Sequence, residues 1–187
     1  MIGPAAGLQP LGITAIGITT LAVSYILWRT ELRMHHYISM HAADRRSTYL
    51  LFAVSLTVSA ALMYFFMLQW FSPALKLPLL FDATVLAALV AQVVAGWVRY
   101  DEGRRGKVHD FFAFAMAWFM LAALVEAFFA GTMPLLPRVV VGLASGYMLA
   151  LMILLGTMPS IRRYTLPLQV SYIGTFFIAV LVATYAV

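Results

Sequence analysis

The chain contains no cysteine, and only 10% of its 187 residues are charged. The absence of cysteine excludes disulfides, thiolate chemistry and cysteine-based metal sites. A soluble domain carries about 25% charged residues, so this charge content excludes an ordinary soluble protein. Because 64% of the residues are hydrophobic and several apolar runs reach the ~20 residues that cross a bilayer as a helix, the composition indicates a polytopic membrane protein.

Several cofactor classes are excluded by missing residues. No lysine lies within an apolar run, so a retinal Schiff base has no attachment site, and no two histidines lie at facing depth to hold a haem. A Walker A loop and a GxSxG sequence are both absent, which argues against a P-loop ATPase and an α/β-hydrolase. We therefore expect no haem, retinal or nucleotide; any other cofactor stays unknown.

The apolar runs predict an all-α fold, a compact bundle of six transmembrane helices that occupies the chain as one domain. The expected spans cover about residues 11–28, 48–70, 79–98, 109–130, 138–157 and 168–187. Pro134 and Pro137 are expected to break the helix between the fourth and fifth spans.

Small side chains recur every four residues in two of the expected spans. The two sets are Ala87, Ala91 and Ala95 in the third span, and Gly142, Gly146 and Ala150 in the fifth. This spacing favours close approach of neighbouring transmembrane helices. We therefore expect the third, fourth and fifth spans to form the tight interior of the bundle.

The basic residues predict the orientation in the membrane. The connections after the first, third and fifth spans carry four, four and two Lys or Arg residues, whereas Lys76 and Arg138 are the basic residues of the other two connections. The positive-inside rule then places the basic loops in the cytoplasm and both termini outside the cell membrane. The net charge of +5 is thereby explained by topology, and no nucleic-acid partner is expected.

The fourth expected span carries ionisable side chains at both ends. His109 and Glu126 are 17 residues apart, which corresponds to about 25 Å along a helix and to one shared face. A carboxylate costs roughly 2.5–3.5 kcal/mol at the bilayer centre and less near an interface. Glu126 is therefore expected to face protein or water rather than lipid.

A second carboxylate, Asp82, is expected at a similar depth because the third and fourth spans are antiparallel. Arg138 lies on the same side of the membrane, and Gln92 lies in the middle of the third span. Together Glu126, Asp82, Gln92 and Arg138 form the predicted ligand-binding or ion-binding site. In the alternative, the carboxylates near the helix ends reach water or pair with Arg138.

All four histidines fall on the side that is predicted to be cytoplasmic. His35, His36 and His41 lie in the first loop with Asp44, and His109 begins the fourth span with Asp110. Histidine and carboxylate ligands are typical of zinc sites, so His35, His36, His41 and Asp44 are candidate metal ligands. No HExxH spacing supports this reading, and interfacial histidines are the alternative.

Short motifs resemble the Frag/DRAM/Sfk-type six-span membrane proteins and related uncharacterised bacterial membrane families. The residues that carry the resemblance are Tyr37-Ile38-Ser39, Arg46, Phe52, Val108-His109-Asp110 and Ala113. The resemblance implies lipid-associated work, such as remodelling of glycolipid anchors, lipid-dependent trafficking or membrane homeostasis, and it nominates Ser39, His109 and Asp110. In those proteins the N-terminus is expected inside, whereas here the charges place it outside.

Three functional hypotheses follow. The first, which is favoured, is a non-enzymatic protein that binds or transports a lipid, small amphiphile or ion, with Glu126 and Asp82 as polar anchors. The second is a lipid-modifying enzyme at the cytoplasmic face, with His109 as general base or metal ligand and Asp110 orienting its ring. The third is an accessory subunit of a larger membrane complex. Expected partners are membrane lipids, with a homo-oligomer left open.

Overall fold

The computed structural model describes residues 7–185, and every regular element in that range is helical. The elements are α1 (Gln9–Arg29), α2 (Ile38–Ala43), α3 (Arg46–Phe66), a π-helical segment (Met67–Phe71), α4 (Ser72–Leu75), α5 (Leu79–Trp97), α6 (Arg104–Ala130), α7 (Leu135–Thr157), a 3-10 segment (Pro159–Tyr164) and α8 (Thr165–Tyr185).

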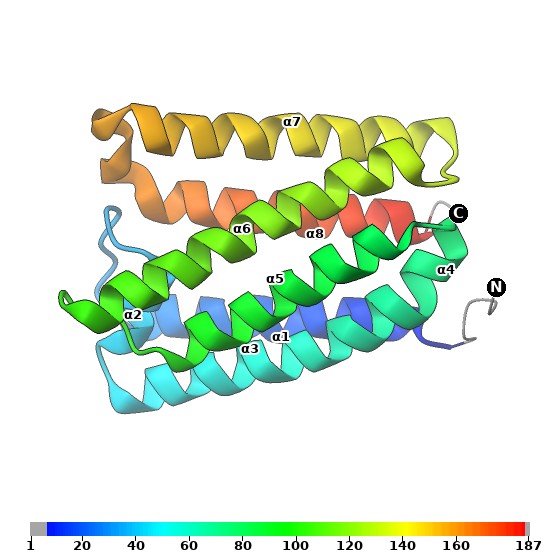
Figure 1. Ribbon diagram of the computed structural model, residues 1–187. Coiled ribbons are helices and arrows are strands. Elements are labelled where there is room, and N and C mark those ends of the chain that lie inside the picture. Colours follow the sequence, from blue (N-terminus) through cyan, green and yellow to red (C-terminus); the bar gives the residue numbers. More distant parts are fainter. Residues whose placement is uncertain (1–6, 186–187) are drawn as a thin grey trace.

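Six of these helices are long and apolar enough to cross a membrane. They are α1, α5, α6, α7, the continuous helix from Arg46 to Leu75, and the helix from Pro159 to Tyr185. They run side by side as one bundle (Figure 1). The structure therefore confirms the predicted all-α fold with six spans, and the chain is a polytopic membrane protein. The last two residues of the sixth expected span, 186 and 187, lie outside the described residues.

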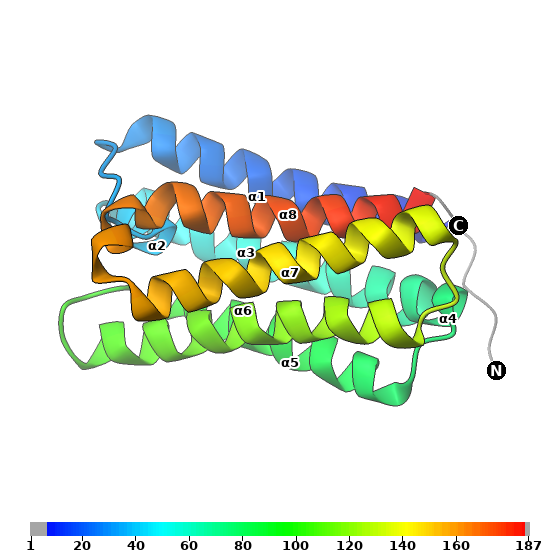
Figure 2. The same cartoon turned by 90° about the horizontal axis from the view of Figure 1, so that it is seen from above.

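The long helices form a closed series around the bundle. Each of α1, α3, α5, α6, α7 and α8 packs on the next in that order, and α8 also touches α1 and α6. The two views in Figures 1 and 2 show α7 lying along the outside, next to α6 and α8. The central space is therefore bounded by α1, α3, α5, α6 and α8.

The two predicted small-residue ridges have different outcomes. In α5, Ala91 and Ala95 are buried, and α5 makes the most extensive helix contact of the bundle with α6. In α7, only Gly142 is in close contact, because a methyl group added there would meet the ring of Phe128 at 2.7 Å. Gly146 and Ala150 are exposed. The expectation that all of the fifth span's ridge would be buried in the interior was therefore wrong.

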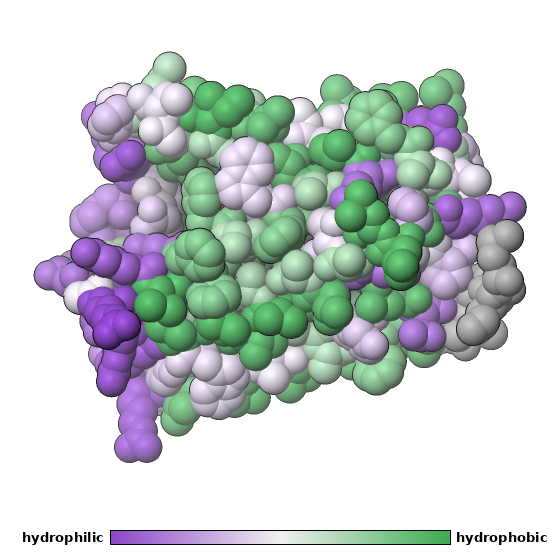
Figure 3. Space-filling view, viewed as in Figure 1, coloured by the Kyte–Doolittle hydropathy of each residue, from purple (hydrophilic) through white to green (hydrophobic). Residues whose placement is uncertain are grey.

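Hydrophilic side chains gather at one end of the bundle, and an apolar band crosses its middle (Figure 3). The hydrophilic end carries the connections after α1, α5 and α7. These connections, together with the helix ends that flank them, hold ten of the twelve Lys and Arg residues. We call this hydrophilic end the basic end. Helix α1 begins and helix α8 ends at the opposite end, which we call the terminal end.

Most of the long helices begin a few residues earlier than the sequence predicts, and α6 and α7 show the local reasons. Helix α6 begins at Arg104 because the Asp101 carboxylate accepts hydrogen bonds from the N–H groups of Gly103 (2.8 Å) and Gly106 (2.9 Å) just before and within its first turn. Helix α7 begins at Leu135, so Pro137 lies inside its first turn rather than breaking a helix. Proline is tolerated there because first-turn N–H groups have no helical partner.

Candidate functional site

A cavity of about 210 Å³ opens at the basic end between α6, α7 and α8. We call it the end cavity. Polar side chains from three parts of the chain reach it: Tyr37, Ser39, His109, Asp110, Thr165 and Gln169. Its remaining lining is mostly apolar, including Phe114, Met116, Met120 and Met152. Ser39, His109 and Asp110, the residues that the sequence resemblance nominates, therefore lie around one cavity.

The short helix α2 brings Ser39 to this cavity, and sequence analysis did not predict that helix. The N–H of Ile38, at the start of α2, donates to the side-chain oxygen of Gln169 in α8 at 2.9 Å. Before it, the carbonyl of Met34 accepts a hydrogen bond from the N–H of Leu166 at 2.9 Å. Ile38 and Ser39 are both buried, so α2 is tucked into the bundle rather than lying in a solvated loop.

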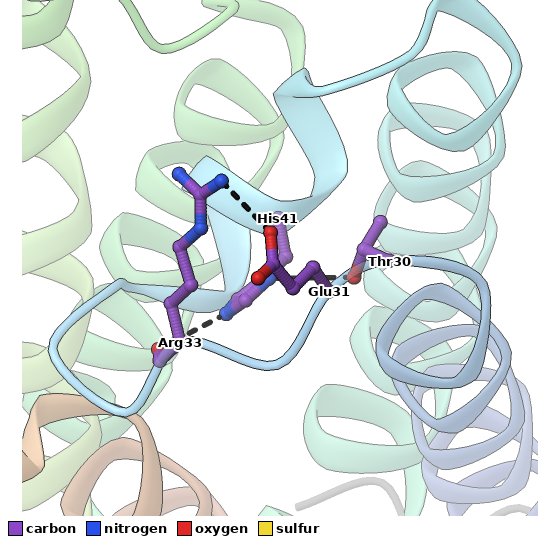
Figure 4. Close-up of polar contacts among 4 residues, drawn as sticks. All are labelled: Thr30, Glu31, Arg33 and His41. Atoms are coloured by element: carbon purple, nitrogen blue, oxygen red, sulfur yellow. Dashed lines mark hydrogen bonds and ion pairs between the residues drawn. The ribbon is translucent and has the colours of Figure 1, made fainter.

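His41 contacts the loop that precedes α2 through both of its ring nitrogens (Figure 4). Its side chain is completely buried. Its Nε2 donates to the carbonyl of Arg33 and its Nδ1 lies beside the Thr30 hydroxyl, both at 3.3 Å. The Arg33 guanidinium forms an exposed ion pair with Glu31 at 3.0 Å. Both ring nitrogens of His41 thus have partners within the loop, which is a structural role.

The other candidate metal ligands do not assemble around His41. The ring of His36 lies 4.5 Å from the ring of His35 and 5.5 Å from that of His41, measured between centroids. Burial lowers the pKa of His36, and the neighbouring His35 and His41 lower it further. Among residues 7–185, no three His, Cys, Asp or Glu side chains come together in a geometry that could hold a metal ion. The geometry gives the predicted metal site at His35, His36, His41 and Asp44 no support.

His109 is buried at the rim of the end cavity. Its Nδ1 donates to the carbonyl of Val98 at 3.0 Å, and the ring of Tyr100 meets its ring edge-on at 5.7 Å. Because Nδ1 carries the hydrogen, the neutral ring keeps a lone pair on Nε2. The Val98 carbonyl therefore orients the imidazole ring. The sequence hypothesis had assigned this orienting role to Asp110.

Asp110 and Tyr37 are exposed residues at the mouth of the end cavity. Partial burial raises the pKa of the Tyr37 phenol, and the negative charge of Asp110 raises it further. The phenol consequently stays protonated at neutral pH and can donate a hydrogen bond. The mouth thus presents a carboxylate, a phenol, the Ser39 hydroxyl and the His109 imidazole next to an apolar interior.

Tyr172, in α8, contacts both of the other helices around the end cavity, α6 and α7. Its hydroxyl donates to the carbonyl of Ala117 in α6 at 2.6 Å and lies 3.6 Å from the sulfur of Met152 in α7. Sequence analysis missed Tyr172 and Gln169 as lining residues. The sequence does show a cluster of polar residues in the first half of the last span. It does not show which other helices these residues contact, so it could not identify them as lining residues.

A second cavity, of about 90 Å³, lies at the centre of the bundle between α1, α3, α5, α6 and α8. It shares four lining residues with the end cavity: Met116, Met120, Gln169 and Ile173. The predicted site residue Gln92 lines it, with its amide nitrogen donating to the carbonyl of Leu56 at 3.0 Å. Two of its hydroxyls are joined by a 2.8 Å bond from Thr19 to Ser59. A few flexible side chains therefore separate the central cavity from the end cavity.

The predicted carboxylate site lies at the terminal end. Glu126 accepts a hydrogen bond from the Thr84 hydroxyl at 2.9 Å, which places it beside the first turns of α5, where Asp82 lies. Arg138 donates to the carbonyl of Gly131 at 2.9 Å and forms no ion pair with Glu126 or Asp82. Among the side chains of residues 7–185, three buried nitrogen or oxygen atoms have no hydrogen-bond partner: Asp82 Oδ1, Glu126 Oε2 and Arg138 Nε. Gln92 binds elsewhere, so the four predicted residues do not form one site.

Comparisons of the chain with protein-family models, with curated proteins and with solved structures found no match. The resemblance to Frag/DRAM/Sfk-type proteins therefore rests on its short sequence motifs and stays a hypothesis.

Proposed function

We propose that this polytopic membrane protein binds an amphiphile, such as a lipid, in the end cavity. The observation that carries the proposal is the division of this cavity into a polar mouth and an apolar interior. Tyr37, Ser39, His109 and Asp110 at the mouth offer both donors and an acceptor to a polar head group. The methionine-rich interior offers an adaptable apolar surface to a hydrocarbon chain.

The dimensions favour one chain of an amphiphile over a whole lipid. Drug-sized ligands occupy pockets of about 300–1,000 Å³, whereas the end cavity measures about 210 Å³. Along α6, its lining extends from His109 to Met120, a length of about 16 Å at the helical rise. That is about half of a ~30 Å hydrocarbon core, so the cavity matches the depth of one leaflet.

A cavity-filling variant tests the proposal. Ala113 lines the end cavity, and Ala113→Phe would occupy its interior. Ala150, on the exposed surface of α7, provides the matched control Ala150→Phe. Native mass spectrometry of each protein, released gently from its own membranes, reports any retained amphiphile. We expect retention by the wild type and by Ala150→Phe, and loss from Ala113→Phe.

The same measurement can contradict the proposal. Equal retention by Ala113→Phe and the wild type would place any bound lipid elsewhere, and a wild type without bound amphiphile would remove the basis of the proposal. A co-purified partner subunit without amphiphile would instead favour the accessory role in a larger complex.

A lipid-modifying enzyme is the second candidate, because one observation favours it. The Val98 carbonyl fixes the His109 ring, and the lone pair on Nε2 is left to accept a proton. Ser39 and Asp110 line the same cavity. If this candidate is correct, wild-type protein converts the retained lipid during incubation, whereas His109→Gln retains the lipid unchanged. Retention without conversion by both proteins would leave the binding function.

A further inference from the structure

A long groove between α1 and α3 lies apart from both cavities described above. Its volume is about 590 Å³, within the range of about 300–1,000 Å³ that is usual for ligand sites. Two arginines, Arg29 and Arg45, line it at the basic end, and leucine and isoleucine side chains line its length. None of its lining residues lies on α6, α7 or α8, so the groove is independent of the end cavity.

At the basic end of the groove, which we call its head, the positive charge has no carboxylate partner. Arg29 and Arg45 are exposed, and no Asp or Glu lines the groove. Within residues 7–185, the ion pair between Arg33 and Glu31 is the only one, so neither arginine is neutralised by a carboxylate. Unpaired guanidinium groups favour a phosphate or carboxylate, which they can bind with two parallel hydrogen bonds.

The start of α3 adds to this positive potential. Helix α3 begins directly after Arg45, and no side chain caps its first N–H groups. Such a terminus carries a partial positive charge that favours an anion. Ser47, in the first turn, is one of the residues that line the groove. The helix terminus therefore reinforces the site that the two arginines define.

The groove is one leaflet deep. On α1 its lining extends from Arg29 to Ile18, and on α3 from Arg45 to Ser55. At the helical rise these lengths are about 16 Å and 15 Å, and half of a ~30 Å hydrocarbon core is about 15 Å. The occupant that matches this geometry has an anionic group at one end and a hydrocarbon chain that reaches the bilayer midplane.

Aromatic residues at the head of the groove also indicate that this end lies at the level of the lipid head groups. The Arg29 guanidinium carbon lies 6.0 Å from the ring centres of both Tyr25 and Trp28. Amphipathic rings prefer the level of the lipid head groups. Arg29 is thus at the depth where lipid phosphates occur.

We infer that the groove between α1 and α3 binds one anionic phospholipid from the leaflet at the basic end. Its phosphate lies between Arg29 and Arg45, and one acyl chain follows the apolar wall past Leu21 and Leu51. A free phosphate ion would satisfy the arginines but leave that apolar wall uncovered, so the lipid is the occupant that accounts for the whole groove.

The test is a titration of the lipid-free protein with dioleoylphosphatidylglycerol, followed by native mass spectrometry, with dioleoylphosphatidylcholine as the neutral lipid. Each arginine near an anionic surface contributes about 1 kcal/mol, so Arg29→Gln and Arg45→Gln are each expected to weaken binding of the anionic lipid about fivefold, and the double variant about thirtyfold. The matched control is Arg162→Gln/Arg163→Gln, which removes the same charge from the basic end outside the groove.

Ser47→Glu separates binding from folding. A carboxylate in the first turn of α3 is favourable for the helix, so the melting temperature of this variant is not expected to fall. The same charge repels a phosphate at the head of the groove, so binding of phosphatidylglycerol is expected to be lost.

Three outcomes would overturn the inference. Equal weakening by the groove pair and by the Arg162/Arg163 pair would show a general attraction to the basic end. Complete displacement of the anionic lipid by excess inorganic phosphate would show a site for a soluble anion. Equal affinity for phosphatidylglycerol and phosphatidylcholine would show that the arginines do not select the head group.

Discussion

At the scale of single residues, the contact between Thr84 and Glu126 gives a prediction about stability. Glu126 has one partner, the Thr84 hydroxyl at 2.9 Å, and its second oxygen is buried without one. Thr84→Val would leave the carboxylate without a donor, at an expected cost of roughly 1–3 kcal/mol in unfolding free energy. Glu126→Gln removes the charge and is expected to cost less. Unfolding titrations in mixed detergent measure both.

The double variant Thr84→Val/Glu126→Gln decides whether the contact is the cause. Valine beside a neutral glutamine leaves no unpaired charge, so the double variant is expected to be more stable than the sum of the two single effects predicts. Strict additivity would show that the two side chains do not interact.

Asp101 gives a prediction about pH. Hydrogen bonds from the backbone N–H groups of Gly106 and Gly103 lower the pKa of its carboxyl group. A folded-state pKa below the unfolded value means that the stabilising contribution is present above the unfolded pKa and is lost as the pH falls through the folded pKa. In an NMR titration, the amide signal of Gly106 is expected to move with a midpoint below the ordinary value of about 3.9. Asp101→Asn is the control, and its Gly106 signal is expected not to move.

At the scale of elements, α2 depends on its buried histidine. Replacing His41 by alanine removes its contacts with Thr30 and Arg33 and leaves a space inside the loop, so we expect a lower melting temperature and faster trypsin cleavage at Arg33. His35→Ala, at an exposed position in the same loop, is expected to change neither. If His41→Ala resisted trypsin as well as the wild type, His41 would not be what holds α2 in place.

Elements also show what the sequence could predict. The six spans followed from length and hydropathy, because the bilayer imposes both on any spanning helix. Helix α2 did not follow, because six residues are too few for a periodic pattern and one of its anchors, Gln169, lies 131 positions along the chain from Ile38.

The candidate site was predictable only as residue types. Ser39, His109 and Asp110 were named from a motif, and the structure brings them to one cavity. The partner of the His109 ring is a backbone carbonyl, and every residue has one, so the sequence had no signal for it. His41 was predicted as a metal ligand because of its residue type. Its ring nitrogens instead contact Thr30 and the Arg33 carbonyl within its own loop, and the sequence had no signal for those contacts either.

At the scale of the whole molecule, the grouping of basic loops at one end gives a prediction about orientation. Since the chain has no cysteine, one introduced cysteine reports one position. Thr132→Cys, between α6 and α7, is expected to react with a membrane-impermeant maleimide on intact cells. Glu102→Cys, between α5 and α6, is expected to react only after the membrane is opened. The reverse pattern would place the basic end outside the cell.

The order of the helices around the bundle also has a consequence for biosynthesis. Helix α8 is synthesised after the other five long helices of the bundle, and it packs beside α1. Until α8 has left the ribosome, one wall of the central cavity is missing, and this cavity is lined by Thr19, Ser59 and Gln92. A chain truncated before α8 therefore exposes polar groups at membrane depth, which is a signal that membrane quality control can use to remove incomplete copies.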